Sequence, residues 1–135
     1  MRDLPARKRI FLLTENCTIL LLEDEPLILM DLEFAAEEKG CEPLCATGVT
    51  GAMKHIETGR IHVAVLDVTL QNGETCVPVA KELDRLEIPY LLHSGDLNRV
   101  NETVRTLGVR HIPKPCDSGK VIAAALEFID KRDAA

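Results

Sequence analysis

The sequence has very little aromatic mass, with no tryptophan, one tyrosine and three phenylalanines in 135 residues. Its core must therefore be built mainly from Leu, Ile, Val and Ala. The sequence also lacks any apolar run near the ~18–20 residues that a membrane-spanning helix needs. Its net charge of −6 argues against a protein that binds nucleic acid or a membrane surface through bulk positive charge.

Length and residue types narrow the class of protein further. At 135 residues the chain is long enough for one domain with a substantial core. Neither GxGxxG nor GxxxxGKS/T occurs, which excludes the common dinucleotide-binding and P-loop enzymes. Five cysteines, an odd number without a CxxC pair, do not indicate a disulfide framework or a zinc site. We interpret them as small thiols in a reducing cytosol and expect a cytoplasmic protein.

The first 16 residues differ in character from the rest. They contain a basic run, Arg7, Lys8 and Arg9, followed by an apolar burst at residues 10–13 that is too short for a signal-peptide core. We expect residues 1–16 to be an extension outside the core, residues 17–132 to form the domain and residues 133–135 to be a tail. The basic run is either solvated or a contact for an acidic partner.

Short apolar runs alternate with longer amphipathic segments along the chain. The runs are rich in Ile, Val and Leu, and several are nearly continuous, which is typical of strands covered on both faces; they are 18–22, 42–46, 62–66, 89–93 and 109–112. The segments that follow them carry helix signals and are 26–39, 50–58, 76–86, 98–107 and 118–131. In the first of these helices, Leu27, Met30 and Phe34 recur on one face, which predicts packing against the core.

Five strand–helix repeats predict an α/β fold with a doubly wound parallel sheet and helices on both faces. In such a sheet, ligands bind beyond the carboxyl ends of the strands. The residues at those ends are Glu23 and Asp24 after the first run, Asp67 after the third, Ser94 after the fourth and Lys114 after the fifth. The sequence therefore predicts that carboxylates, a hydroxyl and an ammonium meet at one edge.

Carboxylates gathered at one place need a cation to stay ionised together. Oxygen-only ligands favour a hard divalent ion, and two or three carboxylates with room for water fit Mg²⁺. An aspartate neutralised in this way also serves as a nucleophile towards a phosphoryl group. The lysine and the hydroxyl would then stabilise phosphoryl oxygens. Considered one at a time, these residues have simpler interpretations: Asp24 as a helix cap, Ser94 as a turn residue and Lys114 as a surface lysine. Their joint occurrence at the ends of the strands favours a site for a metal ion and a phosphoryl group.

Four motifs, in this order, resemble those of response-regulator receiver domains, the phosphoacceptor modules of two-component signalling. They are "ILLLEDEP", "VAVLDVTLQNGE", "PYLLHSG" and "IPKP", and the resemblance covers residues 18 to about 131. The resemblance implies a flavodoxin-like (βα)5 three-layer sandwich with a parallel five-stranded sheet in the order 2-1-3-4-5. Within that family, the sequence resembles stand-alone, single-domain receivers.

The resemblance also implies a role for individual residues. Asp67 matches the phosphoacceptor, and Ser94 and Lys114 match the switch hydroxyl and the lysine that accompany it. The Mg²⁺ ligands would be Asp67, Asp24, Glu23 through water, and the backbone carbonyl of Thr69. The bond from Lys114 to Pro115 is typically cis in the family.

Two positions depart from the commonest pattern of that family. His111 stands where the family usually has the Tyr or Phe rotamer switch, and Gly95 follows Ser94 where alanine is frequent. A histidine still rotates between inward and outward positions and titrates near neutrality. Its simpler interpretation is a surface histidine on an edge strand.

The function expected from this resemblance is signalling rather than enzyme catalysis of the ordinary kind. The chain would accept a phosphoryl group on Asp67 from a sensor histidine kinase or a histidine phosphotransfer protein. It would then dock on a downstream protein through the fourth helix, fifth strand and fifth helix, a face that would also serve a homodimer. The alternative is a pseudo-receiver, an interaction module that acts without phosphorylation. A phosphohydrolase of the haloacid-dehalogenase type is disfavoured because Thr69 stands where that class needs a second aspartate.

Overall fold

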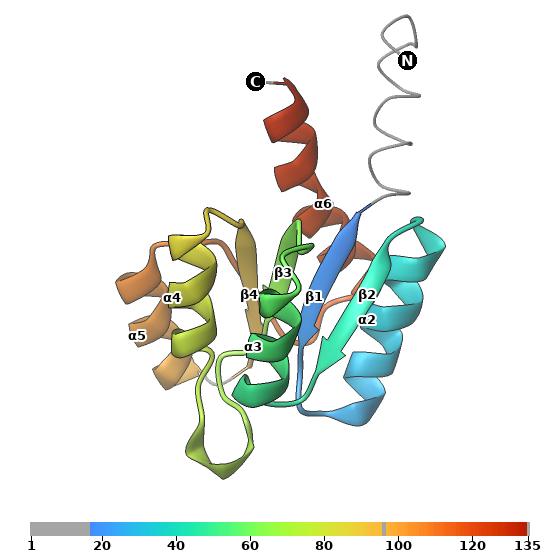
Figure 1. The fold of residues 1–135 in the computed structure, drawn as a ribbon. Helices are drawn as coiled ribbons and strands as arrows, with labels where there is room; N and C mark the ends of the chain where they lie inside the picture. The colour runs from blue at the N-terminus through green and yellow to red at the C-terminus, as the bar shows by residue number, and fades with distance from the viewer. Residues whose placement is uncertain (1–16, 96, 135) are drawn as a thin grey trace, which may run out of the picture.

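The computed structural model describes residues 17–95 and 97–134 of the chain. The predicted extension at residues 1–16 lies outside the described residues. The described part is a three-layer α/β sandwich, with one sheet between two layers of helices (Figure 1). Within it, no helix is long and apolar enough to cross a membrane.

The sheet has five parallel strands in the order β2-β1-β3-β4-β5, so the predicted fold class and strand order are confirmed. The strands are β1 (Thr18–Leu22), β2 (Glu42–Ala46), β3 (Val63–Leu66), β4 (Tyr90–Ser94) and β5 (His111–Pro113). Every residue of β1, β3 and β4 is buried, as expected for strands with helices on both faces. The two edge strands are only partly buried.

The helices divide between the two faces of the sheet. One face carries α2 (Pro26–Glu38) and α6 (Ser118–Ala134), and the other carries α3 (Val49–Glu57), α4 (Val77–Arg85) and α5 (Leu97–Leu107) (Figure 1). A short 3-10 helix, η1 (Gln71–Gly73), follows β3 and was not predicted. Each face of the sheet therefore has its own apolar cluster, filled mainly by Leu, Ile, Val and Ala.

The helix boundaries agree with the sequence to within a few residues, but one predicted helix face is wrong. Leu27, Met30 and Phe34 of α2 are 75%, 60% and 63% exposed, and are not packed in the core. The residues of α2 that are buried are instead Leu32, Ala35 and Ala36.

The physical reason for this error lies in the composition of α2. The helix is apolar around most of its circumference, so the sequence pattern does not single out one face. Small alanines allow α2 to approach the sheet and α6 closely, and this packing sets the rotation of the helix about its axis. Leu86, which follows the last residue of α4, is likewise 40% exposed.

Candidate functional site

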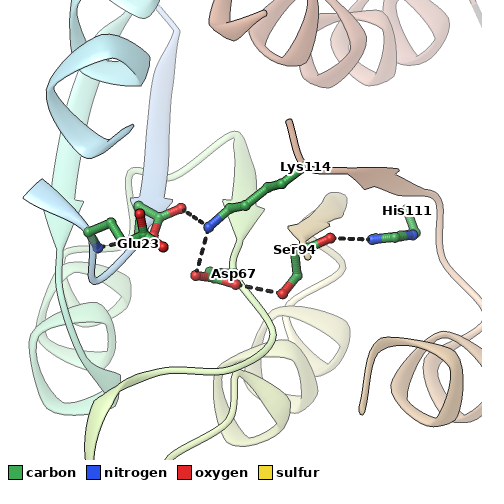
Figure 2. A network of polar contacts seen from close by, with 6 residues as sticks. Glu23, Asp67, Ser94, His111 and Lys114 are labelled. Atoms are coloured by element: carbon green, nitrogen blue, oxygen red, sulfur yellow. Dashed lines mark hydrogen bonds and ion pairs between the residues drawn. The ribbon is translucent and has the colours of Figure 1, made fainter. Parts of the chain in front are cut away.

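Four of the strands end in polar side chains that point toward one another at one edge of the sheet (Figure 2). Glu23 follows β1, Asp67 follows β3, Ser94 ends β4 and Lys114 follows β5. Glu23, Asp67 and Ser94 are buried, and the Lys114 side chain is 15% exposed. The parallel topology brings them together, because all carboxyl ends of parallel strands lie at the same edge.

The carboxylate of Asp67 is held from two sides. Its Oδ1 accepts a hydrogen bond from Ser94 Oγ at 2.7 Å, and its Oδ2 lies 3.1 Å from Lys114 Nζ (Figure 2). Each oxygen thus has one donor, and the two donors come from β4 and from the end of β5. This arrangement fixes the orientation of a buried nucleophilic group.

Lys114 also forms an ion pair with the second buried carboxylate. Its Nζ lies 2.8 Å from Glu23 Oε1, so one ammonium bridges Glu23 and Asp67 (Figure 2). Burial lowers the pKa of Lys114, but the two carboxylates outweigh it and leave that pKa above its usual range. The lysine is therefore a fixed positive charge at this edge of the sheet.

Glu23 lies in a less favourable environment. Burial is the main cause that raises the pKa of Glu23 to about 7, and the charge of Asp67 adds to it. Lys114 and the backbone N–H of Glu25, which donates to Glu23 Oε2 at 3.1 Å, oppose that rise. Burial thus disfavours the ionised form of Glu23, and two buried carboxylates share the single positive charge of Lys114.

A cation site is consistent with this surplus of negative charge. One oxygen each from Glu23, Asp24 and Asp67 lies within 4.8 Å of the others. Asp24 is half-buried, so the cluster is open to solvent on its side. Oxygen-only donors and access for water are what Mg²⁺ prefers in proteins, so the residues present fit that ion.

His111 and Thr69 complete the predicted set of site residues. His111 Nε2 lies 3.0 Å from the backbone oxygen of Ser94, and because a carbonyl only accepts, this ring nitrogen carries the hydrogen (Figure 2). The ring thus contacts the backbone of the residue whose hydroxyl holds Asp67. Thr69 forms an isolated bridge with Thr75 just after β3. The role of its carbonyl as a metal ligand stays a prediction.

One residue of the site region was missed by the sequence analysis. His93 is 3% exposed, and neither of its ring nitrogens has a hydrogen-bond partner among the described residues. Burial lowers the pKa of His93 to about 4; Lys114 and His111 lower it further, and Asp67 opposes them. The sequence signal was a histidine within the run "YLLHS", where a buried strand was expected.

The loop between β5 and α6 also has the predicted backbone form. The Lys114–Pro115 peptide bond is cis, as the family resemblance implied. The N–H of Lys114 donates to the Ser94 carbonyl oxygen at 3.3 Å, so β4 and the end of β5 are tied together beside Asp67.

Comparison with solved structures identifies the class of protein to which this fold and site belong. The chain is similar to SdrG from Sphingomonas melonis Fr1, with 34% identity and a TM-score of 0.70, over 84% of this chain and 95% of that one. It is also similar to the receiver domain of the Francisella response regulator 1452, with 20% identity and a TM-score of 0.72, over 87% of this chain and 99% of that one. A CheY-like receiver domain protein from Methanospirillum hungatei JF-1 has 20% identity and a TM-score of 0.75, over 87% of this chain and 97% of that one.

The two matches at 20% identity show a shared fold, and the match at 34% identity shows homology. No family model and no curated protein matched the sequence. The chain belongs to the receiver-domain family of response regulators, as the motifs predicted. Membership of that family indicates a signalling protein.

Proposed function

We propose that this chain is a single-domain response regulator that accepts a phosphoryl group on Asp67. The donor would be the phosphohistidine of a sensor histidine kinase or of a histidine phosphotransfer protein in the cytoplasm. The observation that carries the proposal is the set of donors on Asp67, with Ser94 on one oxygen and Lys114 on the other. The remaining side of the site is occupied by the carboxylates of Glu23 and Asp24.

The chemistry follows from what these side chains do. A carboxylate oxygen of Asp67 attacks phosphorus, an O–P bond forms, and the P–N bond to the donor histidine breaks with its electron pair passing to the imidazole. Lys114 lies within 3.1 Å of Asp67 and is therefore placed to donate to a phosphoryl oxygen attached there. Burial of Asp67 at 4% exposure limits the access of water to the product.

Magnesium would be held by Asp24 and Asp67, with Glu23 acting through water and Thr69 through its carbonyl. When bound, it supplies positive charge that neutralises phosphoryl oxygens during transfer. The residues themselves leave a place for such charge, because three carboxylates lie close together and Lys114 pairs with two of them, Glu23 and Asp67.

Phosphorylation would change the contacts of Ser94 first. The aspartyl phosphate adds about one negative charge and new acceptor oxygens. Ser94 Oγ, which now donates to Asp67, would turn to one of those oxygens, and Lys114 would follow. His111 contacts the Ser94 carbonyl, so such a movement reaches β5 directly. The surface formed by α5, β5 and α6 would then dock on a downstream protein or on a second copy of the chain.

The test of this proposal compares Asp67→Asn with the wild-type chain. Both are incubated with Mg²⁺ and either a small phosphodonor or a phosphorylated histidine kinase, and the added mass is measured on the intact protein. We expect one phosphoryl group on the wild type and none on Asp67→Asn. The control is Asp84→Asn, since Asp84 is exposed and bonds to Tyr90 at the start of β4, away from the site. Equal labelling of Asp67→Asn would remove Asp67 from the proposed role.

A further inference from the structure

Helix α2 exposes an apolar face that no other described part of the chain covers. The face is formed by Leu27, Met30 and Phe34, at spacings of three and four residues, with exposed fractions of 75%, 60% and 63%. Single exposed apolar residues are ordinary, but three large ones on adjoining turns form a patch. Phe34 also borders an open hollow between α2 and the start of α6. We call these three residues the α2 face.

The part of the chain that precedes the domain begins close to this helix. The carbonyl oxygen of Cys17 accepts a hydrogen bond from the N–H of Glu42 at 2.8 Å, and Cys17 and Cys41 contact each other through their side chains. Cys41 lies three residues beyond the last residue of α2. The chain therefore enters the described domain, at Cys17, next to the carboxyl end of α2.

The reach of that segment matches the position of the α2 face. Residues 13 and 10 stand four and seven positions before Cys17, so an extended chain places them up to ~13 and ~23 Å from it. Along a helix that rises ~1.5 Å per residue, Phe34 lies roughly 10 Å and Leu27 roughly 21 Å from Cys41. The apolar residues Ile10, Phe11, Leu12 and Leu13 thus span the same interval as the apolar face.

The charges on the two segments are also complementary. Helix α2 has four carboxylates and no Lys or Arg, and Asp31, Glu37 and Glu38 among them are exposed. The segment before the domain has Arg7, Lys8 and Arg9 directly before its apolar residues. If the segment runs antiparallel to α2, these cations come to the amino end of the helix, where exposed Glu25 lies.

We propose that residues 7–13 of the chain pack back along α2 and cover the α2 face. Ile10, Phe11, Leu12 and Leu13 remove Leu27, Met30 and Phe34 from water, and the basic run contacts Glu25, the residue that precedes the helix. The driving force is burial of apolar surface from both segments. Because α2 begins three residues after Glu23, the covering segment ends beside the candidate phosphoacceptor site. The inference does not depend on phosphorylation of Asp67.

The sharpest test uses the methionine methyl groups of the full-length, unphosphorylated chain. There are only three methionines, and Met53 of α3 packs on the opposite face of the sheet, so it is an internal reference for Met30. In the wild type, we expect the Met30 methyl signal to be protected from a soluble paramagnetic probe. In Phe11→Ser/Leu12→Ser, we expect its paramagnetic broadening to rise several-fold while that of Met53 stays the same. Leu4→Ser, a matched change outside residues 7–13, should leave Met30 protected.

Further measurements distinguish residues 7–13 from other possible occupants of the α2 face. Protection of Met30 that disappears on dilution, together with a dimer by light scattering, would mean that a second copy covers the face and would overturn the proposal. A Met30 methyl that is already fully accessible in the wild type would overturn it too, and would leave the face to a separate partner. The charge reversal Arg7→Glu/Lys8→Glu/Arg9→Glu should expose Met30 as the apolar variant does. Unchanged protection in both variants would exclude residues 7–13 as the cover.

Discussion

The buried histidine beside the phosphoacceptor gives the most quantitative prediction. His93 is 3% exposed, and its two ring nitrogens lack hydrogen-bond partners in the described part of the chain. The ionisable groups near it include Lys114, His111 and Asp67. The perturbation is His93→Leu, which replaces the imidazole with an apolar side chain of similar size in an apolar cluster. His93 is paired with Ile112 and alternates onto the face of the sheet that Leu91 shares, and both of these residues belong to the apolar cluster on that face. We expect the variant to be more stable than the wild type, and increasingly so as the pH falls.

The expected change in the free energy of unfolding has one part that depends on pH and one part that does not. The pKa of His93 is lowered from 6.5 to about 4, so the unfolded chain takes up the proton first. The stability linked to this group is fully present above pH 6.5 and is lost as the pH falls toward 4. At ~1.4 kcal/mol per pH unit, this amounts to about 2 kcal/mol at pH 5 and about 3 kcal/mol at pH 4. Independently of pH, each buried polar atom without a partner costs about 1–3 kcal/mol.

The assay is urea unfolding of the wild type and His93→Leu at pH 7.5 and pH 5, at one fixed Mg²⁺ concentration. We expect the free energy of unfolding of His93→Leu to exceed that of the wild type by at least about 1 kcal/mol at pH 7.5 and by about 3 kcal/mol or more at pH 5. The dependence of that free energy on urea concentration should have the same slope in both proteins. His93→Gln separates the two parts, because it removes the titration and keeps a buried polar group. It should lose the part of the pH dependence that comes from His93, without the gain in the free energy of unfolding at pH 7.5. A His93→Leu chain that is less stable at both pH values, with the wild-type pH dependence, would refute the reasoning.

The remaining predictions concern the cation site, the switch and the core. Asp24→Ala should lose the Mg²⁺ dependence of phosphorylation along with phosphorylation itself, and wild-type labelling of the intact mass with added Mg²⁺ would contradict it. Ser94→Ala should still be labelled on Asp67, but the amide shifts of β5 and α6 on phosphorylation should shrink; shifts of wild-type size would point to another switch. Leu83→Ala, which empties a fully buried site in α4, should cost about 2–5 kcal/mol in urea unfolding. Leu86→Ala, directly after the same helix, should cost less than about 1 kcal/mol because the side chain is 40% exposed, and equal losses would contradict the assignment of the core.

Most of the fold was predictable because the buried strands have a strong signal. In β1, a continuous apolar run is bounded by charged residues at its carboxyl end, and the strand has the predicted bounds Thr18–Leu22. The weakest prediction was β5, expected at 109–112 and found at His111–Pro113. This edge strand has three residues and is only partly buried, so few apolar positions mark its ends.

The site was more predictable than the orientation of α2, and the difference has a physical cause. Glu23, Asp67, Ser94 and Lys114 meet because each follows or ends a strand of one parallel sheet, so topology alone brings their backbones to one edge. No comparable constraint sets the rotation of α2, whose exposed face carries larger apolar residues than the buried alanines beneath it. His93 was missed for a related reason, since a strand pattern gives the burial of a residue but not the partners of its polar atoms. The order of strands along the chain thus decides which polar residues meet at the ends of the strands. The face that a helix buries, and the hydrogen-bond partners of a buried polar atom, depend instead on how the side chains pack.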